Sequence, residues 1–238
     1  GPRLLPDDSI CEFEAGRACL EQGCLSRRAW VALMAQRWLW ERWRDVFHLF
    51  VANSATMERR LAEHGIGPTM VIWNGVPRRS PRPPLADPPV VAFAGRLSHE
   101  KGVAVLLRAF AEARRSIPAA RLVVAGEGPE RDRLIALARE LGIETGVRWT
   151  GHLDREGMEH ELETAWVQAV PSILEEPFGL VAAEAMMRGT AVVAAGHGGL
   201  SEIVQPDETG LLVKPNDSAA LAGALIALLG DRERSEEM

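Results

Sequence analysis

The sequence lacks the features that mark several large classes of protein. No stretch approaches twenty uninterrupted apolar residues, the length that an α-helix needs to cross a bilayer, and no secretory signal pattern opens it. Cys11, Cys19 and Cys24 have no histidine nearby that would complete a structural zinc site. So few cysteines, odd in number, are typical of reduced thiols inside the cell. We therefore expect a cytoplasmic protein.

Lysine is also scarce, and positive charge does not dominate. The formal net charge is −6, and no basic stripe runs along the chain, which argues against nucleic acid as a partner. Lys101 and Lys214 are the two lysines, whereas arginine supplies the other basic residues. A lysine in a loop suited to phosphate is therefore more informative here than in most proteins.

After Pro89 the sequence alternates regularly between short apolar runs and helical periods. With 47% hydrophobic residues the chain can fill a core. Strands that alternate with helices of this length predict a parallel sheet covered on both faces. We therefore predict an α/β fold, a Rossmann-like doubly wound parallel sheet, over residues 90–238. The predicted strands are 90–94, 122–125, 147–150, 167–170, 191–195 and 210–213, and the predicted helices are 103–117, 129–141, 156–165, 179–188 and 218–229.

The segment EEPFGLVAAEA, residues 175–185, is the most informative in the chain. It follows the predicted strand 167–170, and a proline and a glycine turn the chain before a predicted helix. The open amides at such a helix start bind anions, and the helix dipole adds to this. Glu176 and Glu184 do not bind phosphate, but carboxylates accept hydrogen bonds from hydroxyls. The pattern therefore suits a nucleotide-sugar, unless Glu184 is an ordinary first-turn carboxylate that stabilises the dipole.

A glycosidase pair is a rival interpretation of the two glutamates. Eight residues along one helix would separate Glu176 and Glu184 by about 12 Å and rotate them about 80° apart. Glycosidase carboxylates lie roughly 5–9.5 Å apart and face the same bond. Pro177 also moves Glu176 off the helix, because the residue before a proline is pushed out of the α region. The two glutamates are therefore expected to bind different parts of one ligand.

A second segment, FAGRLSHEKG at residues 93–102, closes the predicted strand 90–94. Arg96 and Lys101 lie in the loop at the carboxyl end of that strand, where open α/β sheets bind ligands. Alternatively, Arg96 and Lys101 are two solvated cations at a helix start that bind no ligand, but the helix dipole disfavours positive charge at that end. The mismatch favours a ligand.

These two segments resemble the signatures of the retaining glycosyltransferases of family 4, which have the two-domain GT-B architecture. Three further segments resemble the same family in the same order, over almost all of residues 90–238. They are GEGP at 126–129, GGLSEIV at 198–204 and TGLLV at 209–213.

The resemblance implies a role for each residue that matches the motifs. Arg96 and Lys101 would bind the diphosphate of a nucleoside diphosphate-sugar donor, Glu176 would face hydroxyls of the transferred sugar, and Glu184 would face the ribose. The other expected donor contacts are the amides of Phe178, Gly179 and Leu180, with Gly95 and His152 beside the donor. His197 also follows a predicted strand and could approach a ligand.

The resemblance further implies a retaining, hexosyltransferase-like enzyme of carbohydrate biosynthesis that moves a sugar to a hydroxyl acceptor, either a sugar or a lipid-linked molecule. No Asp-x-Asp pair occurs in the sequence, so we expect no metal and no other cofactor. A noncatalytic nucleotide-sugar-binding module is the alternative. An NAD-dependent oxidoreductase is a poorer one, because Gly126 and Gly128 are followed by Arg131 rather than by a third glycine.

Residues 1–76 resemble the rear part of the family's N-terminal, acceptor-binding domain, with strands expected near 47–54 and 69–76. Residues 77–89 are rich in proline and arginine and are expected to form a stiff linker. Two strands leave a parallel sheet incomplete. We therefore expect a fragment that binds donor but transfers sugar poorly.

A helix is expected over residues 29–50, with Trp30, Trp38, Trp40 and Trp43 among several arginines. These rings would either pack against the rest of the acceptor-binding domain or contact the inner face of a membrane peripherally. Self-association of the fragment through this face is a further possibility.

Overall fold

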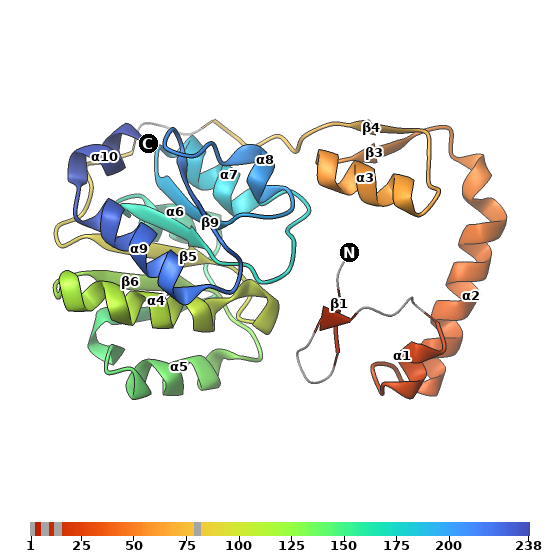
Figure 1. The fold of residues 1–238 in the computed structure, drawn as a ribbon, viewed down its shortest axis with the longest axis horizontal. Coiled ribbons are helices and arrows are strands. Elements are labelled where there is room, and N and C mark those ends of the chain that lie inside the picture. The colour runs from red at the N-terminus through yellow and green to blue at the C-terminus, as the bar shows by residue number, and fades with distance from the viewer. Residues whose placement is uncertain (1–2, 6–9, 12–15, 79–81) are drawn as a thin grey trace. The chain divides into compact units, whose positions relative to one another are not determined.

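The structure is a computed structural model that describes residues 3–5, 10–11, 16–78 and 82–238. The chain divides into two compact units, Gly1–Ile72 and the larger Trp73–Met238 (Figure 1).

The larger unit is built on a six-stranded parallel sheet with the strand order β10-β9-β8-β5-β6-β7. The chain begins in the middle at β5 and adds β6 and β7 on one side. It then crosses back to β8 and adds β9 and β10 on the other side. The strands are β5 (Val90–Ala94), β6 (Arg121–Ala125), β7 (Val147–Gly151), β8 (Val167–Val170), β9 (Ala191–Ala195) and β10 (Gly210–Val213).

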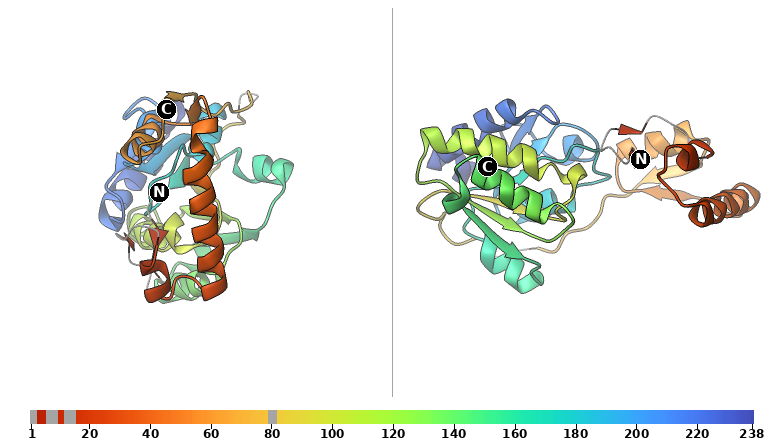
Figure 2. Two further views of the ribbon diagram at one scale, coloured as in Figure 1. Left: turned by 90° about the vertical axis from the view of Figure 1, so that its right-hand side faces the viewer. Right: turned by 90° about the horizontal axis from the view of Figure 1, so that it is seen from below.

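Helices cover both faces of this sheet, as Figures 1 and 2 show. One layer holds α4 (Val103–Ser116), α5 (Arg131–Glu140) and α9 (Ser218–Leu229), and the other holds α6 (Arg155–Leu162), α7 (Leu180–Met187) and α8 (Leu200–Ile203). Val91 and Phe93 of β5 face the first layer, whereas Ala92 between them faces α6, because side chains alternate along a strand. A final helix, α10 (Arg232–Glu237), packs on α9.

The predicted doubly wound α/β fold is confirmed. Strands β5, β8, β9 and β10 and helix α9 have the predicted bounds, and the other elements predicted over residues 90–238 differ by up to three residues at their ends. In the smaller unit, the strands expected near 47–54 and 69–76 are shorter, at Phe50–Ala52 and Thr69–Val71. Caps explain some of these ends, since the Asp154 carboxylate accepts from Gly157 N and α6 therefore begins at Arg155. The short helices α8 and α10 and the 3-10 turns η2 (His99–Lys101) and η3 (Glu144–Gly146) were not predicted.

Much of the predicted linker 77–89 packs onto the larger unit instead of standing free. Leu85 is buried in the main core, and Ala86 donates its N–H to the carbonyl of Thr164 at 2.9 Å. The Trp166 indole in turn donates to the carbonyl of Ala86 at 2.6 Å. An apolar anchor, one backbone hydrogen bond and one hydrogen bond from the Trp166 indole therefore hold residues 82–89 against the larger unit, while residues 79–81 lie outside the described part.

The smaller unit contains a parallel strand pair joined through a helix. Phe50 of β3 pairs with Thr69 of β4, and the Ser54 hydroxyl caps α3 by accepting from Met57 N at 3.1 Å. An antiparallel pair of two-residue strands lies near the start of the unit. The elements are β1 (Arg3–Leu4), β2 (Ile10–Cys11), α1 (Ala18–Glu21), α2 (Arg27–Trp43), η1 (Arg44–Val46), β3 (Phe50–Ala52), α3 (Ala55–Glu63) and β4 (Thr69–Val71).

The prediction of one helix over residues 29–50 is wrong at its end. The helix α2 stops at Trp43, and the chain turns so that Trp40 lies against Phe47 and Phe50, with ring centroids 5.9 and 5.7 Å away. Contacts among these three rings accompany the turn, although Phe47 stays 53% exposed. Trp38 and Trp43 remain 62% and 56% exposed. None of the described helices combines the length and the apolar character needed to span a bilayer, and peripheral membrane contact stays a prediction.

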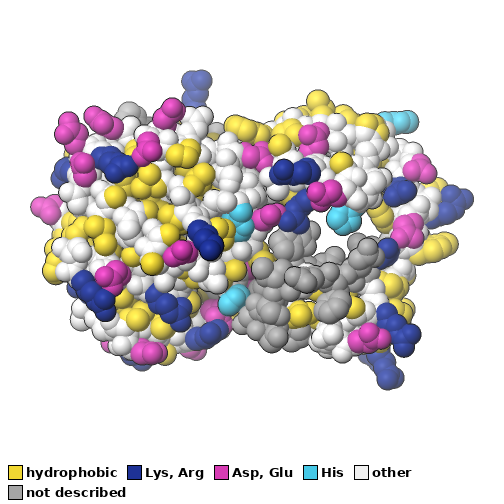
Figure 3. Space-filling view, in the orientation of Figure 1, with side chains coloured by type: hydrophobic (Ala, Val, Ile, Leu, Met, Phe, Trp, Pro, Cys, Tyr) yellow, Lys and Arg dark blue, Asp and Glu magenta, His cyan; other side chains and the backbone are white. Residues whose placement is uncertain are grey.

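The surface of the larger unit carries charges of both signs. Figure 3 shows Lys and Arg side chains interspersed with Asp and Glu over the face in view. Several form exposed ion pairs, such as Arg139 with Glu144 and Arg148 with Glu161. Exposed pairs of this kind contribute little to stability.

Candidate functional site

The strand order predicts a crevice between β5 and β8 at the carboxyl edge of the sheet. These strands are neighbours, yet the chain leaves β5 for α4 on one face and leaves β8 for α7 on the other. Open α/β sheets bind ligands at such a topological switch point, because the two loops separate there. Both segments singled out in the sequence, 93–102 and 175–185, lie at this point.

The two loops are in direct backbone contact at the floor of the crevice. Ile173 N donates to the carbonyl of Glu100 at 2.8 Å. Gly102 has a φ of 69° and lies so close to Pro171 that an added Cβ would stand 2.0 Å from the Pro171 carbonyl oxygen. Only glycine satisfies both the left-handed backbone and this close approach.

We expect Gly102→Ala to destabilise the larger unit by about 1–3 kcal/mol, because the strained backbone and the clash with Pro171 add to each other. For a chain of this size that corresponds to a loss of roughly 2–4 °C in melting temperature per kcal/mol. Gly223→Ala is the matched control: Gly223 is exposed in α9, and its added Cβ would meet nothing within 4 Å. That control should gain about 0.5–1 kcal/mol. Equal melting temperatures for the two variants would contradict the tight contact.

Two helices begin at this crevice with open amides. Gly102 is the N-cap of α4 and Gly179 the N-cap of α7, both left-handed, and no side chain from the described residues caps either start. The first N–H groups of an uncapped helix have no internal partner, and the dipole makes them attractive to anions. This part of the site can therefore hold an anion such as phosphate.

Lys101 and Glu176 meet between these two helix starts. Lys101 Nζ lies 2.6 Å from Glu176 Oε1, and the Ser172 hydroxyl donates to the same oxygen at 2.7 Å. The side chains of Lys101 and Glu176 are 32% and 17% exposed, so the pair is partly shielded but open to a ligand. Lys101 lies before the α4 start, the unfavourable end of the dipole for a cation, and Glu176 supplies the compensating charge.

The remaining charges of the β5–α4 loop are Arg96 and Glu100. Burial raises the pKa of Glu100, but hydrogen bonds from Ser98 Oγ and the backbone, with the charges of Lys101 and Arg96, outweigh burial and hold the pKa below its ordinary value. Glu100 is therefore an anion that organises its own loop, with Ser98 Oγ 2.5 Å from its Oε1. Arg96 is exposed at the end of β5.

Glu184 lies in the second turn of α7, five residues into the helix that begins at Leu180. The alternative that it is a first-turn carboxylate is therefore wrong. Glu176 precedes the N-cap Gly179 and is off the helix, as Pro177 predicted. Within the described part of the chain, the Glu184 carboxylate makes no hydrogen bond or ion pair, so it is available to a ligand.

The loop after β9 completes the site; the sequence singled out His197 as a residue that could approach a ligand, but not the contacts that this loop makes. Gly199 N donates to the carbonyl of Glu176 at 2.8 Å, and His197 Nε2 lies 2.9 Å from the carbonyl oxygen of Ser172. A carbonyl only accepts, so that nitrogen of His197 carries a hydrogen. Ser172 was also missed; its position four residues before Glu176 was the available signal.

The other predicted residues have different surroundings. Phe178 is buried beside Trp73 with ring centroids 6.3 Å apart, which leaves its backbone rather than its ring for a ligand. Gly95 donates its N–H to Ala125, and His152 is exposed after β7. Leu180 is the exposed first residue of α7. The structure thus brings Lys101 and Glu176 into contact but shows no contact of Arg96 or His152 with them.

Gly126 and Gly128, the two glycines of the incomplete dinucleotide fingerprint, have a packing role in this fold. An added Cβ at Gly126 would stand 1.9 Å from the carbonyl oxygen of Gly95. Gly128 makes an equally close approach to the carbonyl of Leu97. These glycines let the β5 and β6 loops pack together, so their spacing has a structural cause.

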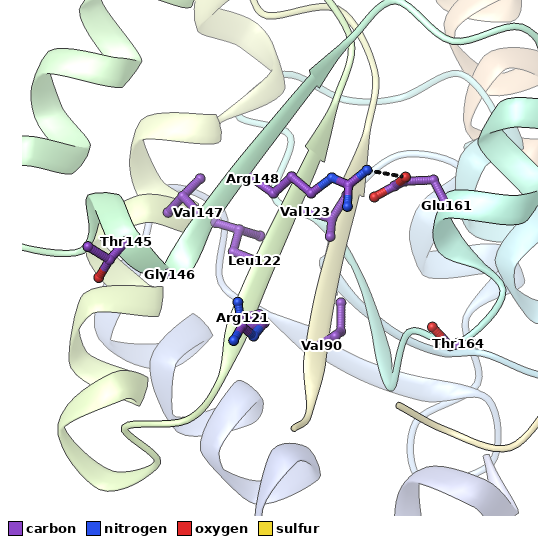
Figure 4. Close-up of a pocket in the computed structure, with 10 residues that line it drawn as sticks. All are labelled: Val90, Arg121, Leu122, Val123, Thr145, Gly146, Val147, Arg148, Glu161 and Thr164. Atoms are coloured by element: carbon purple, nitrogen blue, oxygen red, sulfur yellow. Dashed lines mark hydrogen bonds and ion pairs between the residues drawn. The ribbon is translucent and has the colours of Figure 1, made fainter. Parts of the chain in front are cut away.

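A hollow of about 260 Å³ lies at the opposite edge of the sheet, at the amino ends of β5, β6 and β7. Figure 4 shows Arg148 reaching across it to Glu161, with Val90 and Val123 at its floor. It lies apart from the crevice and shares no residue with it. Nowhere in the described residues do three or more His, Cys, Asp or Glu side chains gather so as to hold a metal ion.

Sequence comparisons give a consistent picture. The model of the family "Glycosyl transferases group 1" matches residues 78–238. A glycogen synthase of Mycobacterium tuberculosis is 37% identical over 188 residues, which cover 76% of this chain and 45% of that protein. A D-inositol 3-phosphate glycosyltransferase of Nocardia farcinica is 45% identical over 157 residues, 63% of this chain and 35% of that protein. The chain spans less than half the length of these curated relatives.

Solved structures agree. Sucrose-phosphate synthase from Thermosynechococcus elongatus is 32% identical with a TM-score of 0.69, covering 82% of this chain and 53% of that one. HepE of Anabaena, solved with UDP and glucose, is 28% identical with a TM-score of 0.71, covering 80% and 56%. The neighbours share the GT-B fold, and the family match takes in the whole sheet with the crevice. The chain belongs to the glycosyl transferases group 1 family.

Proposed function

We propose that this chain binds a nucleoside diphosphate-sugar and serves the transfer of the sugar to a hydroxyl acceptor, with retention of anomeric configuration and without a metal. The contact of Lys101 with Glu176 between two open helix starts carries the proposal, because it joins a diphosphate-binding group to a hydroxyl-binding group. A nucleoside diphosphate-sugar needs both within a few ångströms, because its sugar and its diphosphate share the bond that breaks.

Each group then has a chemical task. As the glycosidic bond breaks, negative charge gathers on the leaving diphosphate, and fixed donors aimed at that charge are usually the largest catalytic term. Lys101, with the amides of Gly179 and Leu180, supplies those donors, and exposed Arg96 adds positive charge at the rim. Glu176 accepts from the sugar hydroxyls, and Glu184, in the second turn of α7, accepts from the ribose.

Calorimetric titration with UDP, GDP and ADP and their glucose conjugates tests the proposal. We expect base-selective binding that EDTA leaves unchanged; UDP and UDP-glucose are the first choice, because HepE was solved with each. Binding without measurable transfer to any sugar acceptor, both by this chain and by a longer form of the protein, would favour a noncatalytic module. Absence of binding to all six ligands would overturn the proposal.

Glu184→Ala should weaken binding of the preferred nucleoside diphosphate by about 1–3 kcal/mol, the range for a buried partner left without its hydrogen bond. The matching 2′-deoxynucleotide should bind the wild type more weakly, while Glu184→Ala should add little further loss for it. Glu140→Ala, an exposed glutamate of α5, is the matched control and should bind as the wild type does. If Glu184→Ala weakens both nucleotides equally, the ribose assignment is wrong.

A further inference from the structure

The side chain of Glu176 is held by one oxygen. Its Oε1 accepts from both Lys101 Nζ at 2.6 Å and Ser172 Oγ at 2.7 Å. Among the described residues, nothing donates a hydrogen bond to Oε2. A carboxylate oxygen has about two lone-pair sites, so Oε1 is saturated and Oε2 is left with its full capacity.

The backbone that carries Ser172 is clamped from two sides. Its carbonyl accepts from His197 in the β9 loop, and the next residue, Ile173, donates to Glu100 in the β5 loop. The residue before it, Pro171, lies against Gly102. Ser172 itself is 2% exposed, so its hydroxyl has little freedom to point elsewhere.

The two donors on Oε1 differ in rigidity. The ammonium of Lys101 stands at the end of a flexible four-carbon stem and is 32% exposed. Ser172 has one rotatable bond and a fixed backbone. The serine, and not the lysine, is therefore the group that can fix the direction of the carboxylate.

We propose that Ser172 is a positioning residue, which fixes Glu176 Oε1 so that Oε2 faces the hydroxyls of the donor sugar. The inference rests on the proposed function and adds to it a residue that does not touch the ligand. Without the hydroxyl, Glu176 follows the mobile ammonium, and part of the binding free energy of the sugar goes into fixing the carboxylate.

Ser172→Ala, titrated with UDP and UDP-glucose or with the diphosphate and glucose conjugate of the preferred base, tests this. We expect the affinity for the plain diphosphate to stay within about two-fold, because Lys101 and the amides remain. The affinity for the sugar conjugate should fall roughly five- to ten-fold, the cost of one ordinary hydrogen bond. Ser172→Thr, which keeps the hydroxyl, should restore it, and exposed Ser201→Ala should change nothing.

The outcomes distinguish a positioning role of Ser172 from a role in the fold and from failure of the proposed function. If Ser172→Ala binds both ligands as the wild type does, the positioning role is refuted. Equal losses for both ligands, accompanied by a lower melting temperature, would assign Ser172 to the fold alone; Ser172→Cys, close to serine in size, would then repeat the comparison. If the wild type binds neither ligand, the proposed function itself fails, and this inference fails with it.

Discussion

Glu176→Gln should change the affinities for the two ligand classes in opposite directions. In the wild type the Glu176 carboxylate neutralises Lys101 at 2.6 Å and repels an incoming diphosphate. Removing its charge from a partly screened site beside a phosphate should strengthen binding of the plain diphosphate by about 1 kcal/mol, roughly five-fold. The ratio of the affinity for the sugar conjugate to the affinity for the plain diphosphate should fall by about 10- to 100-fold, because a neutral amide is a poorer acceptor for hydroxyls.

Titration of the same variant with the preferred diphosphate and its glucose conjugate measures both effects. Where transfer is measurable in a longer form of the protein, kcat/KM should fall on the order of 10²-fold. Glu140→Gln, which removes an equal charge from an exposed position of α5, controls for net charge. If the plain diphosphate binds more weakly to Glu176→Gln than to the wild type, the Glu176 carboxylate does not repel the diphosphate.

Lys101→Ala should weaken the diphosphate by about 1.5–3 kcal/mol, roughly 10- to 150-fold, and should leave the plain nucleoside nearly unaffected. The loss has two parts, since a cation disappears and Glu176 is left with an uncompensated charge beside the phosphate. Lys214→Ala is the natural control, as the only other lysine in the sequence and an exposed one. Equal losses for nucleoside and diphosphate would mean that Lys101 does not touch phosphate.

The double variant Lys101→Ala/Glu176→Gln then tests whether Lys101 contacts Glu176 and the diphosphate at the same time. An ammonium has three N–H donors, and Glu176 takes one of them. We therefore expect Lys101 to bridge the carboxylate and the diphosphate, and Lys101→Ala should cost less in the Glu176→Gln background than in the wild type, because no uncompensated carboxylate is then left beside the phosphate. A larger cost of Lys101→Ala in the Glu176→Gln background would show instead that the ion pair must break when the diphosphate binds.

Much of the larger unit was predictable because its signals are local. The apolar run of β9 and the capped start of helix α9 can each be recognised within a dozen residues of sequence, and both elements have the predicted bounds. Asp217 caps α9 by accepting from Ala220 N, a signal in the sequence itself. The smaller unit was predicted less well, since the end of α2 depends on Trp40 meeting Phe47 and Phe50 across a turn.

The same division applies to the site. The sequence by itself determined the types of group present: an uncapped helix start after Gly179, a carboxylate placed off the helix by Pro177, and a lysine before a second helix. These follow from turn chemistry and helix ends, which act over a few residues.

Only the tertiary structure decided which of these groups meet. Lys101 and Glu176 are 75 residues apart in the chain, and they touch because the chain returns to place β8 beside β5. Periodicity reveals strands but not their order, since order depends on which crossovers bury the most apolar surface over the whole sheet. The contacts of Ser172 and His197 became visible for the same reason: they reach across loops that only the strand order brings together.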